Sequence, residues 1–223
     1  MSCANLPQVA TTGAPRVLTV WGRASSVNVM KVLWLLDELA IPFERIEAGG
    51  AFGRTRDADY AAMNPNATVP TLVMPHGYSL WESHAILRYL CRIQPGGNTF
   101  YPEAPEARAD VERWMDWTLA SLNEPMRVIF WTFVRTPEAE RDLPAAARAR
   151  DSAERLWRMV EARLGETGFI AGGFSIADIV LGCFVHRWFA LPVARPEMPV
   201  LRGWYERLLH RPAYRAHVAQ PMS

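Results

Sequence analysis

Lysine is nearly absent from this chain of 223 residues, in which Lys31 is the only one. The positive charge is therefore carried almost entirely by arginines, which are scattered among acidic residues and leave a net charge of +1. The chain has no basic run, which argues against nucleic acid as the main partner. No apolar stretch approaches the ~20 residues that a helix needs to cross a bilayer, so we expect no membrane partner.

Cysteine is also scarce. Cys3, Cys91 and Cys183 lie far apart and form no C-x-x-C pair. This pattern argues against a disulfide framework or a zinc site and fits a reducing cytoplasm, where we expect the protein to reside. The histidines show no spacing typical of metal ligands, and no metal is expected. Residues 1–15 lack a positively charged start followed by an apolar core, so we interpret them as a loose tail and not as a signal peptide.

Half of the residues are apolar, and the chain is long enough to bury a substantial core. Residues 16–21 form a short β run, and a helix with apolar positions at Val29, Val32, Leu33 and Leu36 follows. Residues 41–46 form the next strand. A strand-helix-strand unit implies a parallel pair with a right-handed crossover. A short helix is predicted near residues 57–63.

The segment from Val69 to Ser83 organises the rest of the chain. Because proline has no N–H, Pro70 belongs at the first position of the strand at residues 71–74 or in a turn, and an X-Pro bond is the common place for a cis peptide. A second short strand, residues 78–80, leads into a helix that begins at Glu82-Ser83. Ser83 therefore lies where helix N–H groups favour a carboxylate. Glu82 beside it can accept a hydrogen bond from an ammonium group, so the pair suits a free amino-acid end.

The order V-P-x-L and then L-x-E-S-x-A-I-x-x-Y-L, residues 69–90, resembles the glutathione-binding half of cytosolic glutathione transferases. The predicted β-α-β-α-β-β-α layout resembles the thioredoxin-like fold. The resemblance implies that Val69, before a cis-Pro70, pairs with the cysteinyl backbone of glutathione. It also implies that Glu82 and Ser83 hold the γ-glutamyl end. The purely structural alternative is a strand-turn-helix with a capping serine.

The pattern breaks near residue 94, and every long segment after this break is predicted to be helical. We therefore expect a thioredoxin-like glutathione-binding domain at 16–94, a linker at 95–104 and an all-helical domain at 105–223. Ser175 and Asp178 form a candidate capping box, and Phe174 with Ile179 is placed for a hydrophobic staple. The same S-x-A-D box occurs in the helical domain of glutathione transferases, where its role is in folding.

The thiol of glutathione is mostly protonated at neutral pH, because a free thiol has a pKa of ~8.5, although the thiolate is the nucleophile. A donor aimed at the sulfur should follow the first strand, where Ser25, Ser26 and Asn28 are the candidates. The loop has no tyrosine or cysteine, unlike the tyrosine-type and cysteine-type transferases. The loop resembles that of serine-type, theta-like or nu-like bacterial transferases. By this resemblance we expect Ser26 to stabilise the thiolate, with Asn28 as a second donor. Ser25 is the alternative to Ser26.

Two further parts of the site have only weak candidates. Arg23, Arg54 and Arg56 lie in nearby loops and could meet the glycine carboxylate of glutathione, although each is more often a solvated arginine. The electrophile pocket could be bordered by aromatic and Met side chains of the first long helix, at positions that more often serve the core. They are Trp114, Met115, Trp117 and Phe130.

The resemblance implies a homodimeric glutathione S-transferase of the detoxification type, with glutathione as co-substrate and an electrophilic small molecule or peroxide as second substrate. One alternative is an isomerase of the maleylacetoacetate type, whose motif has Ser-Ser-Cys where this chain has Ser25-Ser26-Val27. The other alternative is a non-enzymatic transferase-like binding module. The sequence does not name the electrophile.

Overall fold

The computed structural model describes residues 17–222. The loose tail predicted for residues 1–15 lies outside this range, as does Cys3. The described chain begins with a mixed four-stranded sheet of order β2-β1-β3-β4, in which β1 and β2 are parallel and the other neighbours are antiparallel. Its strands are β1 (Leu18–Trp21), β2 (Phe43–Ile46), β3 (Thr71–Val73) and β4 (Ser79–Trp81).

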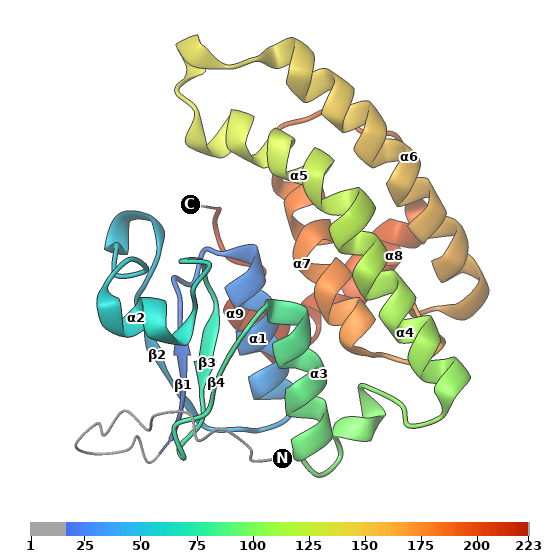
Figure 1. Cartoon of the computed structure of the whole chain (residues 1–223). Helices are drawn as coiled ribbons and strands as arrows, with labels where there is room; N and C mark the ends of the chain where they lie inside the picture. The colour runs from blue at the N-terminus through green and yellow to red at the C-terminus, as the bar shows by residue number, and fades with distance from the viewer. Residues whose placement is uncertain (1–16, 223) are drawn as a thin grey trace, which may run out of the picture.

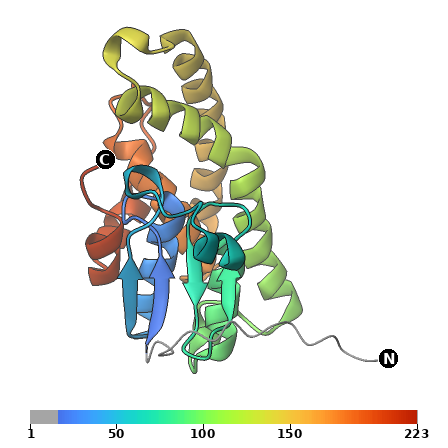
Figure 2. The ribbon, with the colours of Figure 1, turned by 60° about the vertical axis from the view of Figure 1, so that its left-hand side comes forward.

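Three helices flank the sheet. The helices α1 (Val27–Glu38) and α3 (Ser83–Ile93) lie on the face that is turned toward the rest of the chain (Figure 1). The short α2 (Ala58–Met63) lies on the opposite side, in front of the sheet in Figure 2. This arrangement is the thioredoxin-like β-α-β-α-β-β-α unit, and it confirms the predicted fold of the first part of the chain.

The remaining described residues form an all-helical domain, which confirms the second part of the predicted fold class. The segment after α4 is not one regular helix, because two π-helical turns, Thr118–Leu122 and Trp131–Arg135, flank α5. Single π turns inside helices often occur at functional sites. The helices are α4 (Pro105–Trp117), α5 (Asn123–Phe130), α6 (Leu143–Thr167), α7 (Ile176–Ala190), α8 (Pro199–Leu209) and α9 (Pro212–His217).

The two parts share one hydrophobic core along α1. Its residues from Val29 to Leu36 are all buried, on every side of the helix. A helix that is buried all round must be covered by other elements, and α1 packs against α3, α7 and α9 (Figure 1). An ion pair between Arg211 and Glu38, at 2.6 Å, joins the end of the chain to the same helix.

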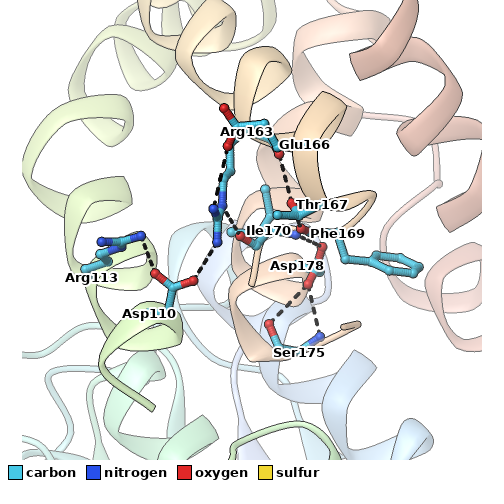
Figure 3. A network of polar contacts seen from close by, with 9 residues as sticks. All are labelled: Asp110, Arg113, Arg163, Glu166, Thr167, Phe169, Ile170, Ser175 and Asp178. Carbon is cyan, nitrogen blue, oxygen red and sulfur yellow. Dashed lines mark hydrogen bonds and ion pairs between the residues drawn. The ribbon is translucent and has the colours of Figure 1, made fainter. Parts of the chain in front are cut away.

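The start of α7 is fixed by the predicted capping box. Both reciprocal bonds of the box are present between Ser175 and Asp178. The Asp178 carboxylate is buried and also accepts from the backbone N–H of Ile170 at 3.1 Å and from Nε1 of Trp204 at 3.1 Å. Figure 3 shows how Arg163 connects this corner to α4, since it donates to the Ile170 carbonyl and to Asp110.

Short structural details differ from the sequence expectation. The first strand begins at Leu18 and the second at Phe43, each two residues later than predicted. Within residues 17–222 no helix combines the length and apolar character needed to cross a membrane. The division at residues 95–104 stays a prediction.

Candidate functional site

A cavity of about 400 Å³ lies between the thioredoxin-like part and the helical domain. One wall comes from the β1–α1 loop, the start of α1 and the loop before β3. The other wall comes from α5, the π turn after it and the last half of α7. The side chains that line the cavity include those of Arg23, Ser25, Ser26, Asn28, Val69, Arg127, Phe130, Trp131, Arg135, Phe184 and Arg187.

The β1–α1 loop packs closely against the start of α1 and the loop before β3 at Gly22. Gly22 has φ +155°, and a Cβ at this position would lie 2.4 Å from Cγ2 of Val29 and 3.2 Å from Cβ of Val69. Only glycine permits this approach. Ser26 occupies the N-cap position of α1, yet its side chain makes no capping hydrogen bond. Its hydroxyl is therefore available to the cavity, although the residue is largely buried.

The Asn28 side chain is oriented by Lys31. The Lys31 ammonium group donates to Asn28 Oδ1 at 2.9 Å and approaches Nε2 of His84 at 3.1 Å. Burial lowers the pKa of Lys31 to about 8, although the nearby Glu82 carboxylate acts in the opposite direction. Burial also lowers the pKa of His84, so its ring is neutral and can accept at Nε2. Because Oδ1 of Asn28 is engaged, the Asn28 amide N–H groups are left for the cavity.

The loop before β3 carries the predicted cis peptide between Val69 and Pro70. Two side chains hold the backbone just before this peptide, because Tyr60 Oη and Asn64 Nδ2 both donate to the Thr68 carbonyl, at 2.5 and 2.9 Å. Val69 itself makes no backbone hydrogen bond within the described part of the chain. Its N–H and C=O are therefore open to pairing with an extended ligand.

The junction between β4 and α3 has an unusual backbone. Glu82 has φ +73°, a left-handed conformation that costs energy for a non-glycine residue and often occurs at functional sites. Ser83, the first residue of α3, is buried, and its hydroxyl has no hydrogen-bond partner among the described residues. A buried hydroxyl without a partner at a helix N-terminus suits an anionic ligand group.

The structure brings Ser26, Asn28 and Val69 to the cavity wall, together with Ser25. Pro70 is buried, and Glu82 and Ser83 lie outside the cavity lining. Trp81, which precedes Glu82, pairs with Thr71 across the sheet, and His84, which follows Ser83, contacts Lys31 through Nε2. Of the six predicted site residues, Ser26, Asn28 and Val69 therefore line the cavity, whereas Pro70, Glu82 and Ser83 do not.

Of the weaker candidates for the glycine carboxylate and the electrophile pocket, only Arg23 and Phe130 line the cavity. Arg23 lines the cavity, whereas Arg54 lies over the Trp21 ring at 4.6 Å from its centroid. Phe130 lines the cavity, but Met115 belongs to the core. Arg56, Trp114 and Trp117 do not contribute to the cavity lining.

Sequence reasoning missed the contributions of the helical domain, namely Arg127, Trp131 and Arg135 near α5 and Phe184 and Arg187 on α7. A signal for Arg187 was present. The stretch Ile179–Arg187 is otherwise uncharged and almost entirely apolar, and a charged residue in such a buried helix is rare unless it has a role.

Comparisons with known proteins agree with this geometry. The glutathione S-transferase N-terminal domain family matches residues 16–92, and the corresponding C-terminal domain family matches residues 144–207. Glutathione S-transferase GstB of Escherichia coli strain K12 is 39% identical over 209 residues, which cover 93% of this chain and 100% of that protein.

Solved structures give the same result. The theta class glutathione S-transferase of Xanthomonas axonopodis pv. citri, crystallised with glutathione bound, is 43% identical and superposes with a TM-score of 0.88, covering 93% of this chain and 99% of that one. A glutathione S-transferase of Pseudomonas fluorescens is 26% identical with a TM-score of 0.79, covering 92% and 98% of the two chains. The chain therefore belongs to the glutathione S-transferase family of enzymes.

Proposed function

We propose that this enzyme binds glutathione along Val69, Glu82 and Ser83 and that Ser26 stabilises the glutathione thiolate for attack on an electrophilic small molecule. The observation that carries the proposal is Ser26 itself. Its hydroxyl occupies a helix N-cap position without capping the helix, and the residue lines the cavity. A hydroxyl in this position that is not needed for the helix is free to donate to a sulfur anion.

The surrounding groups fit the parts of the tripeptide. Val69 offers an unpaired N–H and C=O beside a cis peptide, which suits the cysteinyl backbone. Ser83 and the first turn of α3 suit the γ-glutamyl carboxylate, and Glu82 suits its ammonium group. Asn28 is the second donor to the sulfur, with Oδ1 held by Lys31.

The two alternatives receive no such support. Val27, which lines the cavity, supplies no thiol at the position where an isomerase of the maleylacetoacetate type has cysteine. A non-enzymatic module is disfavoured because the chain has both Ser26 at the cavity and the Glu82-Ser83 pair at the start of α3. The cytoplasm is the proposed location, since glutathione is abundant in reducing compartments and Cys91 and Cys183 are free and buried.

The glutathione site is tested by calorimetric titration of glutathione into the wild type, Ser83→Ala and Ser152→Ala. We expect Ser83→Ala to raise the Kd about tenfold or more, because it removes a hydrogen bond to a charged group. Ser152 on α6 lies away from the cavity and serves as the matched control. Absence of binding to the wild type at millimolar glutathione would contradict the proposal.

The proposal includes a homodimer. Tyr78, Trp81 and Leu119 are exposed by 45%, 40% and 38%, which is high for large apolar side chains. A second copy of the chain could cover them. Light scattering should give the mass of two chains, and a monomer at micromolar concentration would contradict this part of the proposal.

A further inference from the structure

Arg187 is a buried cation in the cavity wall, and the described part of the chain gives it no acidic partner. Its side chain extends from α7, and the residue is only 8% exposed. Its guanidinium group donates to the Ser25 carbonyl at 3.3 Å and lies over the Phe130 ring at 4.0 Å from the centroid. No carboxylate among residues 17–222 lies within ion-pair distance of it. The charge therefore faces the cavity uncompensated.

Other cations lie near it. Arg23 lines the cavity from the β1–α1 loop, also without an acidic partner in the described chain, and Arg135 lines it from the π turn after α5. Burial lowers the pKa of Arg187 to about 10, and the charges of Arg135 and Arg23 act in the same direction. Arg127 differs, because Glu124 pairs with it at 2.7 and 2.8 Å. Among residues 17–222, no Asp or Glu side chain lines the cavity.

A buried charge is costly unless a partner of opposite sign is supplied. Arginine binds carboxylates through two parallel N–H···O bonds, which makes it the residue suited to recognise a planar anion. The Phe130 ring lies against the Arg187 guanidinium group, and Phe130 and Trp131 both line the same wall of the cavity. The wall thus offers an anion-binding group next to an apolar surface.

The position of Arg187 relative to the sulfur narrows the choice of ligand. The proposed contacts to glutathione come from the thioredoxin-like part of the chain, whereas Arg187, Phe130 and Trp131 come from the helical domain that faces it. The hydrogen bond from Arg187 to the Ser25 carbonyl places the guanidinium group beside Ser26. An anion bound by Arg187 would therefore lie between the glutathione thiol and the helical domain, where the second substrate has to approach the sulfur.

We infer that the second substrate is a small electrophile that carries a carboxylate, which Arg187 binds while the apolar part of the molecule lies against Phe130. This inference rests on the proposed glutathione transferase function. The glutathione sulfur forms a bond to the electrophilic carbon, the bond from that carbon to its leaving group breaks, and the leaving group departs with the electron pair. The thiol proton passes to solvent before the attack.

The test compares two probes of nearly equal shape, para-(bromomethyl)benzoate and para-(bromomethyl)benzamide. For each probe, kcat/KM is divided by the uncatalysed rate constant with glutathione, so that the ratio of the two values reports recognition of the charge. We expect the wild type to favour the benzoate about tenfold or more, as a charge-assisted bidentate contact predicts. Arg187→Gln should bring the ratio close to one, and Arg187→Lys should keep part of it.

Arg155→Gln is the matched control, because Arg155 is an exposed arginine on α6 outside the cavity. It should leave the ratio unchanged. A wild-type ratio near one, or an unchanged ratio in Arg187→Gln, would overturn the inference while leaving the proposed function standing. An equal loss for both probes together with weaker glutathione binding would also overturn it, since Arg187 would then serve glutathione. Failure of the wild type to bind glutathione would overturn both proposals.

A second measurement does not depend on a folded variant. The unreactive para-methylbenzoate and para-methylbenzamide are compared as inhibitors of the wild type, competing with the electrophile. The anion should inhibit at a concentration about tenfold lower than the amide. Equal inhibition by the two compounds would contradict recognition of a carboxylate.

Discussion

Lys31 Nζ lies 2.9 Å from Asn28 Oδ1 and thereby fixes which end of the Asn28 amide faces the cavity. If Asn28 donates to the thiolate, Lys31→Met should raise the pKa of the bound glutathione thiol by about one unit, because the amide loses its orientation. Asn28→Ala should have a similar effect, and the double variant should add little more. Thiolate absorbance against pH measures all three. Additive effects would show that Lys31 and Asn28 act independently.

The same lysine gives a pH dependence of stability. Its pKa in the folded protein is about 8, below the ordinary value of 10.5. Between these values the unfolded chain retains a proton that the folded protein has lost, so the free energy of unfolding should rise with pH across this window. The rise is at most about 1.4 kcal/mol per pH unit. Urea unfolding at several pH values gives the free energy of unfolding of the wild type and of Lys31→Met. The difference between the two should rise with pH, and a difference that does not change with pH would contradict this prediction.

Asp178 should be a major determinant of folding. Its carboxylate accepts from the N–H groups of Ile170, Ser175 and Trp204, and from the Ser175 hydroxyl. Asp178→Ala leaves these buried donors without a partner, so the free energy of unfolding should fall by about 3 kcal/mol or more. Asp151→Ala, at an exposed position of α6, is the control and should change it by less than about 0.5 kcal/mol. Similar effects of the two substitutions in urea unfolding would refute this role.

Two helical glycines should respond in opposite ways to alanine. A Cβ on Gly182 would lie 2.7 Å from Cζ3 of Trp34, across the contact between α7 and α1. Overpacking there should destabilise the protein by about 1–3 kcal/mol. A Cβ on Gly165 in α6 would meet nothing within 4 Å. Gly165→Ala should therefore gain about 0.5–1 kcal/mol from helix propensity, and thermal unfolding distinguishes the two. Equal effects would contradict close packing at Gly182.

The local features of the fold were predictable because short-range patterns specify them. Alternation and helical periodicity predicted the β-α-β-α-β-β-α order, and the absence of an N–H in Pro70 predicted its place at the first position of a strand or in a turn. Ser175 and Asp178 predicted the helix start because a capping box spans only four residues. The β1–α1 loop supplied Ser25, Ser26 and Asn28 as candidates, and the resemblance to serine-type transferases favoured Ser26 with Asn28 among them.

Contacts between distant segments were not predictable in this way. Arg187 meets the Ser25 carbonyl across 162 positions of sequence, and Lys31 meets His84 across 53. Helical periodicity shows that α7 is buried but does not show what it is buried against. The π turn that places Arg135 in the wall has no periodic signature of its own. The half of the cavity that selects the second substrate therefore required the structure.

The most direct test of the account is the thiol pKa of bound glutathione, followed by ultraviolet thiolate absorbance in the wild type, Ser26→Ala and Ser25→Ala. We predict that the wild type lowers this pKa by about two units from the free value of ~8.5, which corresponds to about 2.7 kcal/mol. Ser26→Ala should return it close to the free value, and Ser25→Ala should leave it lowered. An unshifted pKa in the wild type, or an undiminished shift in Ser26→Ala, would contradict the role of Ser26.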